Sequence, residues 1–186
     1  MPKVISGNLK GRKINGFDIE GTRPTMDRVK ESLFAMISYY LPDSIILDLF
    51  SGSGNLGIAA ISNGAKKGYF NDYNKKCVQI IKDNINNLGI NEKCVITSFD
   101  YLKAIEYYHK ENIKFDIIFL DPPYKDLINE NIMDNILKKD LLKDKGIIVC
   151  EVNYCMNYNN SKYTLIKEKK YGDKYIYIYQ WDKSNM

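Results

Sequence analysis

After Pro42, short apolar runs alternate with helical stretches, and this alternation is the feature that most restricts the fold of the chain. The apolar runs predict buried strands at residues 45–49, 68–71, 94–97, 115–120 and 146–150. The stretches between them predict helices at residues 56–63, 75–88, 101–111 and 129–137. Strands that alternate with helices favour a mostly parallel sheet with helices on both faces, so we predict an α/β protein.

The two ends of the chain depart from this pattern. Residues 163–169 and 175–181, on either side of Gly172-Asp173, predict an antiparallel hairpin, which suits a methyltransferase sheet better than a plain dinucleotide-binding fold. Near the start, residues 3–6 and 12–14 predict a small ribbon. A chain of 186 residues is enough for one domain. We therefore expect a single domain over residues 1–186, with an N-terminal extension at 1–43 and a core at 44–186.

The N-terminal extension also contains a predicted helix that follows Thr25, a plausible N-cap. Met26, Val29, Leu33 and Ile37 recur at helical spacing and predict its buried face. Arg28 and Lys30 are expected to lie away from that face.

Positive charge is concentrated in the first thirty residues. They hold seven basic and three acidic residues, an excess equal to the +4 net charge of the whole chain. This segment also contains all the arginines of the sequence: Arg12, Arg23 and Arg28. Because the arginine fork binds phosphate in a bidentate manner, these residues are candidates for contact with a nucleic-acid backbone.

Composition argues against several other classes of protein. No apolar run approaches the roughly 20 residues that span a bilayer, and the N-terminus lacks the apolar stretch of a signal peptide. The four cysteines form no Cys-x-x-Cys pair, and His109 is the only histidine. We therefore expect a cytoplasmic protein with reduced thiols, no membrane part and no metal site.

A glycine-rich turn follows the first predicted strand. Gly52, Gly54 and Gly57 match the dinucleotide pattern G-x-G-x-x-G, which on its own leaves an NAD-dependent oxidoreductase open. Asp48 stands just before these glycines. Its carboxylate suits the cationic amino-acid end of S-adenosylmethionine and would repel a pyrophosphate, so the sequence favours S-adenosylmethionine.

Two further acids follow the next two predicted strands. Asp72 is placed to accept the ribose hydroxyls of the cofactor, and Asp100 to accept from its adenine amino group. Ligands of parallel sheets bind beyond the carboxyl ends of the strands. We therefore assign all three acids to one cofactor pocket. The full predicted set is Asp48, Phe50, Gly52, Gly54, Asp72, Tyr73, Asp100 and Tyr101.

The fourth predicted strand ends in Asp121-Pro122-Pro123-Tyr124. The Asp121 carboxylate and the Pro122 carbonyl can accept both N–H bonds of an exocyclic amine, and Tyr124 can stack on the attached ring. The two prolines fix the backbone, so these acceptors are placed in advance. The pattern predicts methylation of a nucleobase amino group.

Together these motifs resemble the RsmD family of bacterial 16S rRNA (guanine-N2) methyltransferases. The resemblance runs through Ile5-Ser6-Gly7, Thr22-Arg23-Pro24-Thr25, Asp48-Leu49-Phe50, Asp121-Pro122-Pro123-Tyr124 and Tyr171-Gly172-Asp173. It implies a Rossmann-like class I methyltransferase with seven strands and a small N-terminal β-hairpin. It also implies S-adenosylmethionine as the methyl donor. The implied acceptor is a guanine of the 966 type in 16S rRNA, within the small ribosomal subunit or its assembly intermediate.

The same resemblance places Arg12, Arg23, Thr25 and Arg28 towards the RNA and makes Asp121 to Tyr124 the catalytic motif. Asn74 is a departure, because the family carries an acid there. We expect the protein to act as a monomer.

Other functions stay open at this point. One is a DNA or RNA adenine-N6 or cytosine-N4 methyltransferase, although no segment is long enough for a target-recognition insert. A glutamine-methylating enzyme usually has Asn where Asp121 stands. A non-catalytic RNA-binding assembly factor is a further alternative.

Overall fold

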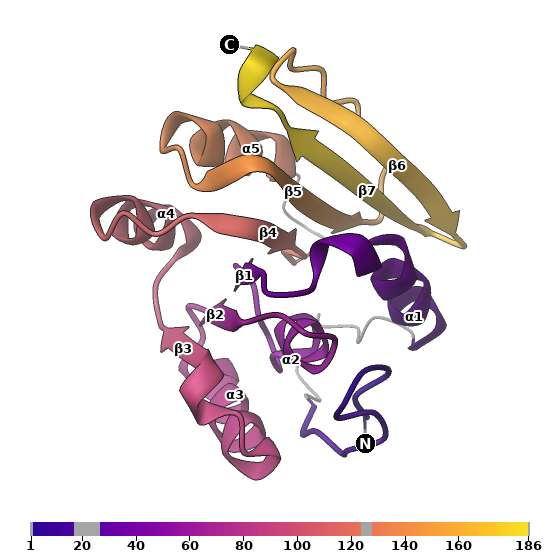
Figure 1. The fold of residues 1–186 in the computed structure, drawn as a ribbon, viewed down its shortest axis with the longest axis vertical. Coiled ribbons are helices and arrows are strands. Elements are labelled where there is room, and N and C mark those ends of the chain that lie inside the picture. The colour runs from indigo at the N-terminus through magenta and orange to yellow at the C-terminus, as the bar shows by residue number, and fades with distance from the viewer. Residues whose placement is uncertain (1, 17–26, 124–127, 186) are drawn as a thin grey trace.

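The computed structural model describes residues 2–16, 27–123 and 128–185, and in these ranges seven strands form one sheet (Figure 1). The strands are β1 (Ile45–Asp48), β2 (Lys67–Asn71), β3 (Cys94–Thr97), β4 (Phe115–Leu120), β5 (Leu142–Val152), β6 (Tyr163–Tyr171) and β7 (Lys174–Trp181). Their order is β3-β2-β1-β4-β5-β7-β6. Strands β1 to β5 pair in parallel, and β7 is antiparallel to both β5 and β6. The predicted class I methyltransferase sheet is confirmed.

Helices cover both faces of this sheet. In the described residues they are α1 (Asp27–Met36), α2 (Asn55–Ser62), α3 (Lys75–Leu88), α4 (Tyr101–Lys110) and α5 (Asn129–Lys138). Short 3₁₀ turns occur at Ser38–Tyr40, Asn91–Lys93 and Lys183–Asn185. Helices α1 to α3 pack on one face, and α4 and α5 on the other. No helix in the described ranges combines the length and apolarity needed to cross a bilayer.

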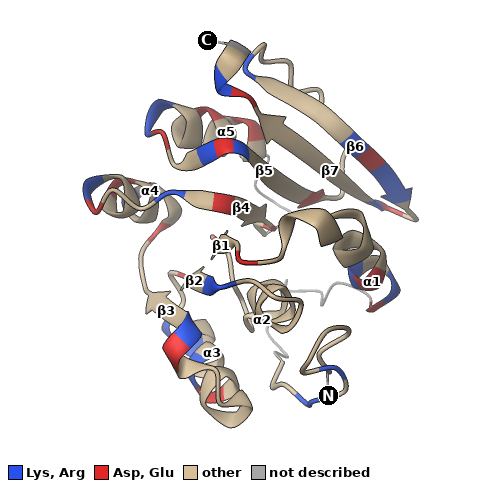
Figure 2. Cartoon of the chain, in the orientation of Figure 1, with Lys and Arg blue, Asp and Glu red and all other residues tan. Residues whose placement is uncertain are grey.

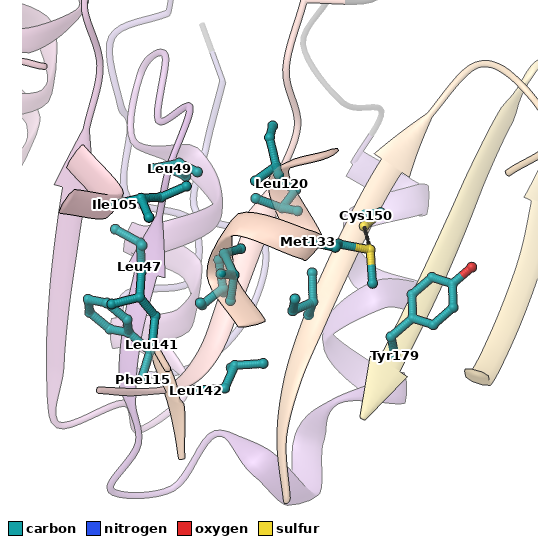
Figure 3. Close-up of a cluster of buried hydrophobic side chains, with 14 of the residues drawn as sticks. Leu47, Leu49, Ile105, Phe115, Leu120, Met133, Leu141, Leu142, Cys150 and Tyr179 are labelled. Atoms are coloured by element: carbon teal, nitrogen blue, oxygen red, sulfur yellow. Dashed lines mark hydrogen bonds between the residues drawn. The ribbon is translucent and has the colours of Figure 1, made fainter. Parts of the chain in front are cut away.

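The central strands are buried on both faces. On β4, Ile118 and Leu120 join the cluster under α4 and α5, while Ile117 and Phe119 join the cluster under α1 and α2. Successive strand residues point to opposite faces, so a strand covered on both sides becomes a continuous apolar run. Figure 3 shows part of the first cluster, in which the sulfur atoms of Met133 and Cys150 lie 3.9 Å apart. This burial explains why the strands were predictable.

The N-terminal ribbon is present but short. It pairs through a single antiparallel bridge between Lys3 and Lys13, with a hydrogen bond of 2.9 Å from the Val4 N–H to the Arg12 carbonyl. The ribbon packs on α2, where the Ser62 hydroxyl donates to the Ser6 carbonyl at 2.6 Å. Helix α2 carries no charged residue, as its tan colour in Figure 2 shows.

Helix α1 has a wider buried face than predicted. Val29, Leu33 and Ile37 are buried as expected, and Met26 lies outside the described residues. Lys30 is buried as well, with 1% of its surface exposed. The prediction that Lys30 lies away from the apolar face is wrong. Lys30 precedes Leu33 and Phe34 by three and four residues, a spacing that places all three on one side of a helix.

Close contact between α2 and β2 requires a glycine at position 57. A Cβ atom there would lie 2.3 Å from Cε1 of the Phe70 ring, a separation that real Cβ contacts do not show. The third glycine of the G-x-G-x-x-G pattern therefore has a packing role, because it lets the helix approach the strand.

We expect Gly57→Ala to destabilise the protein by about 1–3 kcal/mol, the usual cost of overpacking a core, although alanine favours a helix by about 1 kcal/mol over glycine. Urea unfolding measures this difference. The same substitution should cost less in a Phe70→Leu background, which lacks the ring atoms that clash. An equal cost in both backgrounds would contradict this account.

Candidate active site

Four acids lie at or just beyond the carboxyl ends of adjacent strands. Asp48 ends β1, Asp72 follows β2, Asp100 follows β3 and Asp121 follows β4, and these strands are neighbours in the sheet. The structure thus brings the predicted acids to one edge, as expected for parallel strands. Their roles in binding and catalysis remain predictions.

The buried side chain of Asn71 holds part of this edge together. Its amide nitrogen donates to the carbonyls of Leu49 at 3.2 Å and Phe99 at 3.0 Å. Its amide oxygen accepts from the Thr97 hydroxyl at 2.9 Å and the Phe99 N–H at 3.2 Å. One residue of β2 therefore fixes the chain that leaves β1 and the chain that leaves β3. The sequence analysis did not single out this residue.

The glycine-rich turn is anchored by the two predicted cofactor acids. The Asp48 carboxylate accepts from the Gly57 N–H at 3.0 Å. The Asp72 carboxylate accepts from the Gly52 N–H at 2.9 Å and from the Asn74 N–H at 2.9 Å. Gly54 has a φ of 81° where α2 begins, a conformation that suits glycine.

Both acids lie in surroundings that disfavour a negative charge. Asp48 is 2% exposed, and burial raises its pKa to about 7, with the Asp72 charge adding to the rise and the Gly57 N–H opposing it. Burial also raises the pKa of Asp72, against the N–H groups of Asn74 and Gly52. A bound cation would offset this loss of solvation, so the turn suits a positively charged ligand.

Aromatic rings flank this part of the edge. The rings of Phe50 and Tyr101 lie 5.8 Å apart, close enough to form one wall. Tyr73 is 69% exposed. Asp100 caps α4 by accepting from the Lys103 N–H at 3.0 Å, so this acid has a structural role in the helix as well as its predicted one.

Asn74, the departure from the family pattern, caps α3. Its side chain accepts from the Lys76 N–H at 2.9 Å. A carboxylate could accept the same bond, so the substitution preserves the helix start.

The predicted catalytic motif begins where β4 ends. Asp121 is half-buried, Pro122 is buried and Pro123 is exposed, while Tyr124 lies outside the described residues. Burial and the nearby Glu151 carboxylate raise the pKa of Asp121 well above its ordinary value, and the ammonium groups of Lys174 and Lys30 oppose the rise. Asp121 is therefore a more basic carboxylate than an exposed one.

Three charged residues beside Asp121 were missed by the sequence analysis: Lys30, Glu151 and Lys174. Leu120 pairs with Cys150, so Asp121 and Glu151 occupy the next positions of adjacent parallel strands. The Lys174 ammonium donates to the buried Glu151 carboxylate. A signal for Glu151 was available, because it follows the fifth apolar run as Asp121 follows the fourth.

A shallow hollow, too small to admit a water molecule, lies directly beside this motif. It is lined by Pro122, Pro123, Asn129, Glu151, Val152, Asn153 and Tyr154. The hollow joins the end of β4, the end of β5 and the start of α5 at one place.

Two of the four residues predicted to contact RNA are described. Arg12 is exposed and donates to the Asn87 carbonyl at 2.8 Å, and Arg28 is exposed on α1. Arg23 and Thr25 lie outside the described residues.

Comparison with known proteins gives this arrangement a family. The family model described as conserved hypothetical protein 95 matches residues 2–180. Ribosomal RNA small subunit methyltransferase D of Haemophilus influenzae is 34% identical over 183 residues, which cover 96% of this chain and 93% of that protein. The chain belongs to the RsmD family.

Solved structures agree with the RsmD assignment. The Escherichia coli protein yhhF superposes with a TM-score of 0.87 at 26% identity, covering 97% of this chain and 98% of that one. An RNA methyltransferase from Salinibacter ruber was solved in complex with S-adenosyl-L-homocysteine. Its structure has a TM-score of 0.67 at 13% identity and covers 87% of this chain and 95% of that one. At that identity the likeness concerns the fold alone, which is that of a class I methyltransferase.

The Asp48 pKa gives a test of the site's electrostatics. Between pH of about 4 and about 7 the folded protein holds a proton on Asp48 that the unfolded chain has lost. Stability therefore falls as pH rises through this window, by up to about 4 kcal/mol from this residue. Asp48→Asn carries no such proton, so its free energy of unfolding should fall less.

Urea unfolding at pH 4.5 to 8 measures both curves. Asp173→Asn, at an exposed position of the C-terminal hairpin, should follow the wild type and serves as the control. Parallel curves for wild type and Asp48→Asn would show that Asp48 has an ordinary pKa.

Proposed function

We propose that this RsmD-family protein transfers a methyl group from S-adenosylmethionine to the exocyclic N2 of a guanine in the 16S rRNA of the small ribosomal subunit. The observation that carries the proposal is Asp121, a carboxylate of raised pKa at the end of β4, followed at once by Pro122 and Pro123. The names of the relatives, ribosomal RNA small subunit methyltransferase D, support the rRNA substrate.

The residues of the glycine-rich turn fit S-adenosylmethionine. Asp48 and Asp72 are poorly solvated carboxylates that favour a cationic ligand, and Phe50 and Tyr101 provide an aromatic wall. We assign Asp48 to the amino-acid end of the cofactor, Asp72 to its ribose and Asp100 to its adenine. Bound there, S-adenosylmethionine supplies an electrophilic methyl group on a sulfonium. A pyrophosphate would meet the same carboxylates unfavourably, which argues against NAD.

Asp121 and Pro122 are assigned to orient the N2 amine of the guanine. The lone pair of guanine N2 is delocalised into the ring, so the nitrogen must be turned towards sp³ character before it attacks. Accepting its two N–H bonds, the Asp121 carboxylate and the Pro122 carbonyl would orient that lone pair and stabilise the positive charge that develops. The raised pKa of Asp121 also makes it a better acceptor for the proton that the nitrogen then loses.

We assign contact with RNA to residues 1–43, with Arg12, Arg23, Thr25 and Arg28 towards the rRNA. These residues carry the basic excess of the chain, and the ribbon that holds Arg12 is fixed on α2. A paired guanine cannot enter the slot, so the base must be unpaired or flipped, at a cost of a few kcal/mol.

Asp121→Ala should abolish methylation, with a loss of about 10²–10³-fold in kcat, because it removes an acceptor that is placed for the transition state. The assay is methyl transfer to small subunits from a strain lacking the protein, with modified nucleotides identified by mass spectrometry. Asp83→Ala, on α3, is the control. Binding of Asp121→Ala to the particles should persist, and full activity of the variant would refute the assignment.

Arg12→Gln and Arg23→Gln should each weaken binding to small subunits and lower the salt dependence of the binding constant by about one unit of log–log slope. Binding measured at several salt concentrations gives both quantities. Lys138→Gln, at an exposed position in the last turn of α5, is the control. Unchanged affinity in both arginine variants would remove residues 1–43 from the RNA interface.

A further inference from the structure

Lys30 is the one buried ammonium at the catalytic edge for which the described residues provide no hydrogen-bond partner. Its side chain is 1% exposed. The nearest acid is Asp27, whose carboxylate lies 3.5 Å away and is itself 67% exposed. An ion pair with an exposed partner offsets little of the cost of burying a charge.

A buried ammonium like that of Lys30 destabilises the folded protein. Burial lowers the pKa of Lys30, with the Asp27 carboxylate opposing, because the ammonium has lost its water. A methionine would fill the same space on α1 without this cost. With only the exposed Asp27 carboxylate near it, the Lys30 ammonium has donors left for an acceptor that a ligand could supply.

The charges that act on Lys30 locate it within the edge. After Asp27, they are Glu151 on β5 and Lys174 on β7. Lys30 in turn acts on Asp121, at the end of β4. Asp48 and Asp72, by contrast, belong to β1 and the end of β2. One turn after Lys30, α1 packs on these strands, where the Phe34 ring lies 6.1 Å from the ring of Phe119, two residues before Asp121. Lys30 therefore belongs to the β4 and β5 half of the edge.

We infer that Lys30 reads the acceptor base, by donating a hydrogen bond to the O6 carbonyl of the guanine whose N2 amine is held by Asp121. This inference rests on the proposed function. A phosphate at this position would face the carboxylates of Asp27, Asp121 and Glu151, whereas a neutral carbonyl avoids that repulsion and still accepts from an ammonium.

A hydrogen bond from Lys30 to O6 also explains how the site would select guanine over adenine. An adenine held at Asp121 by its N6 amine would present its C2–H, and no acceptor, where guanine presents O6. An ammonium has three donors and no acceptor, so it bonds guanine O6 and finds no partner on adenine. Asp121 alone would accept from either amine. Lys30 is therefore the residue that makes the slot select guanine over adenine.

The test pairs one protein change with one substrate change. Lys30→Met is compared with wild type on small subunits reconstituted with either guanosine or 2-aminopurine riboside at the methylated position. 2-Aminopurine keeps the N2 amine and lacks O6. The wild type should lose about ten- to a hundred-fold in kcat/KM when O6 is removed, the usual effect of losing a charged hydrogen bond.

Lys30→Met should show a similar loss on guanosine and little further loss on 2-aminopurine, because the bond is already absent. Calorimetry should give wild-type affinity of Lys30→Met for S-adenosylmethionine. Lys138→Met, at the exposed position on α5, controls for the loss of a lysine.

Three results would overturn the inference: equal loss on 2-aminopurine in wild type and Lys30→Met, wild-type activity of Lys30→Met on guanosine, or weakened binding of S-adenosylmethionine by a folded Lys30→Met. Full activity of the wild type on 2-aminopurine would do so without any variant, which keeps the test valid if Lys30→Met does not fold. A wild-type protein that leaves the guanosine particles unmethylated would instead refute the proposed function itself.

Discussion

The four hydrogen bonds of Asn71 are the interaction on which the β1, β2 and β3 side of the edge depends. They join the Leu49 carbonyl, which follows β1, to the backbone of Phe99, which follows β3. The turn that carries the glycines and the turn that carries Asp100 are therefore held in fixed positions relative to each other. An apolar residue could fill the space but would leave buried backbone groups of Phe99 and Leu49 unpaired. The rigidity of the turn therefore begins with one amide at the carboxyl end of β2.

The edge divides into two halves with different electrostatics. On the β1 and β2 side, the carboxylates of Asp48 and Asp72 accept from backbone N–H groups and, for Asp72, from the Cys77 thiol, with no basic side chain among these partners, an arrangement that leaves net negative charge for a cation. On the β4 and β5 side, Asp121 and Glu151 are accompanied by the ammonium groups of Lys30 and Lys174. Carboxylates alone suit a sulfonium donor, and a mixture of donors and acceptors suits the edge of a base.

Much of this arrangement could be predicted from the chain, because strands buried on both faces appear as apolar runs and their ends are marked by acids. Asp48, Asp72 and Asp121 were found in this way. Lys30 could not be predicted as a residue of this edge, since a polar residue within an apolar helix stripe is normally assigned to solvent. Asn71 was missed because its role depends on three strands being adjacent. Lys174 was missed because its pairing with Glu151 depends on the order of β5 and β7 in the sheet.

The ion pair between Glu151 and Lys174 has a consequence for biosynthesis. Strand β7 lies between β5 and β6 and follows the other six described strands in the chain, so the edge of β5 stays open until β7 has left the ribosome. Until then Glu151 lacks the counter-charge that Lys174 brings. The nascent chain can therefore complete the glycine-rich turn early, but the half of the edge that we assign to the base matures only once β7 has emerged.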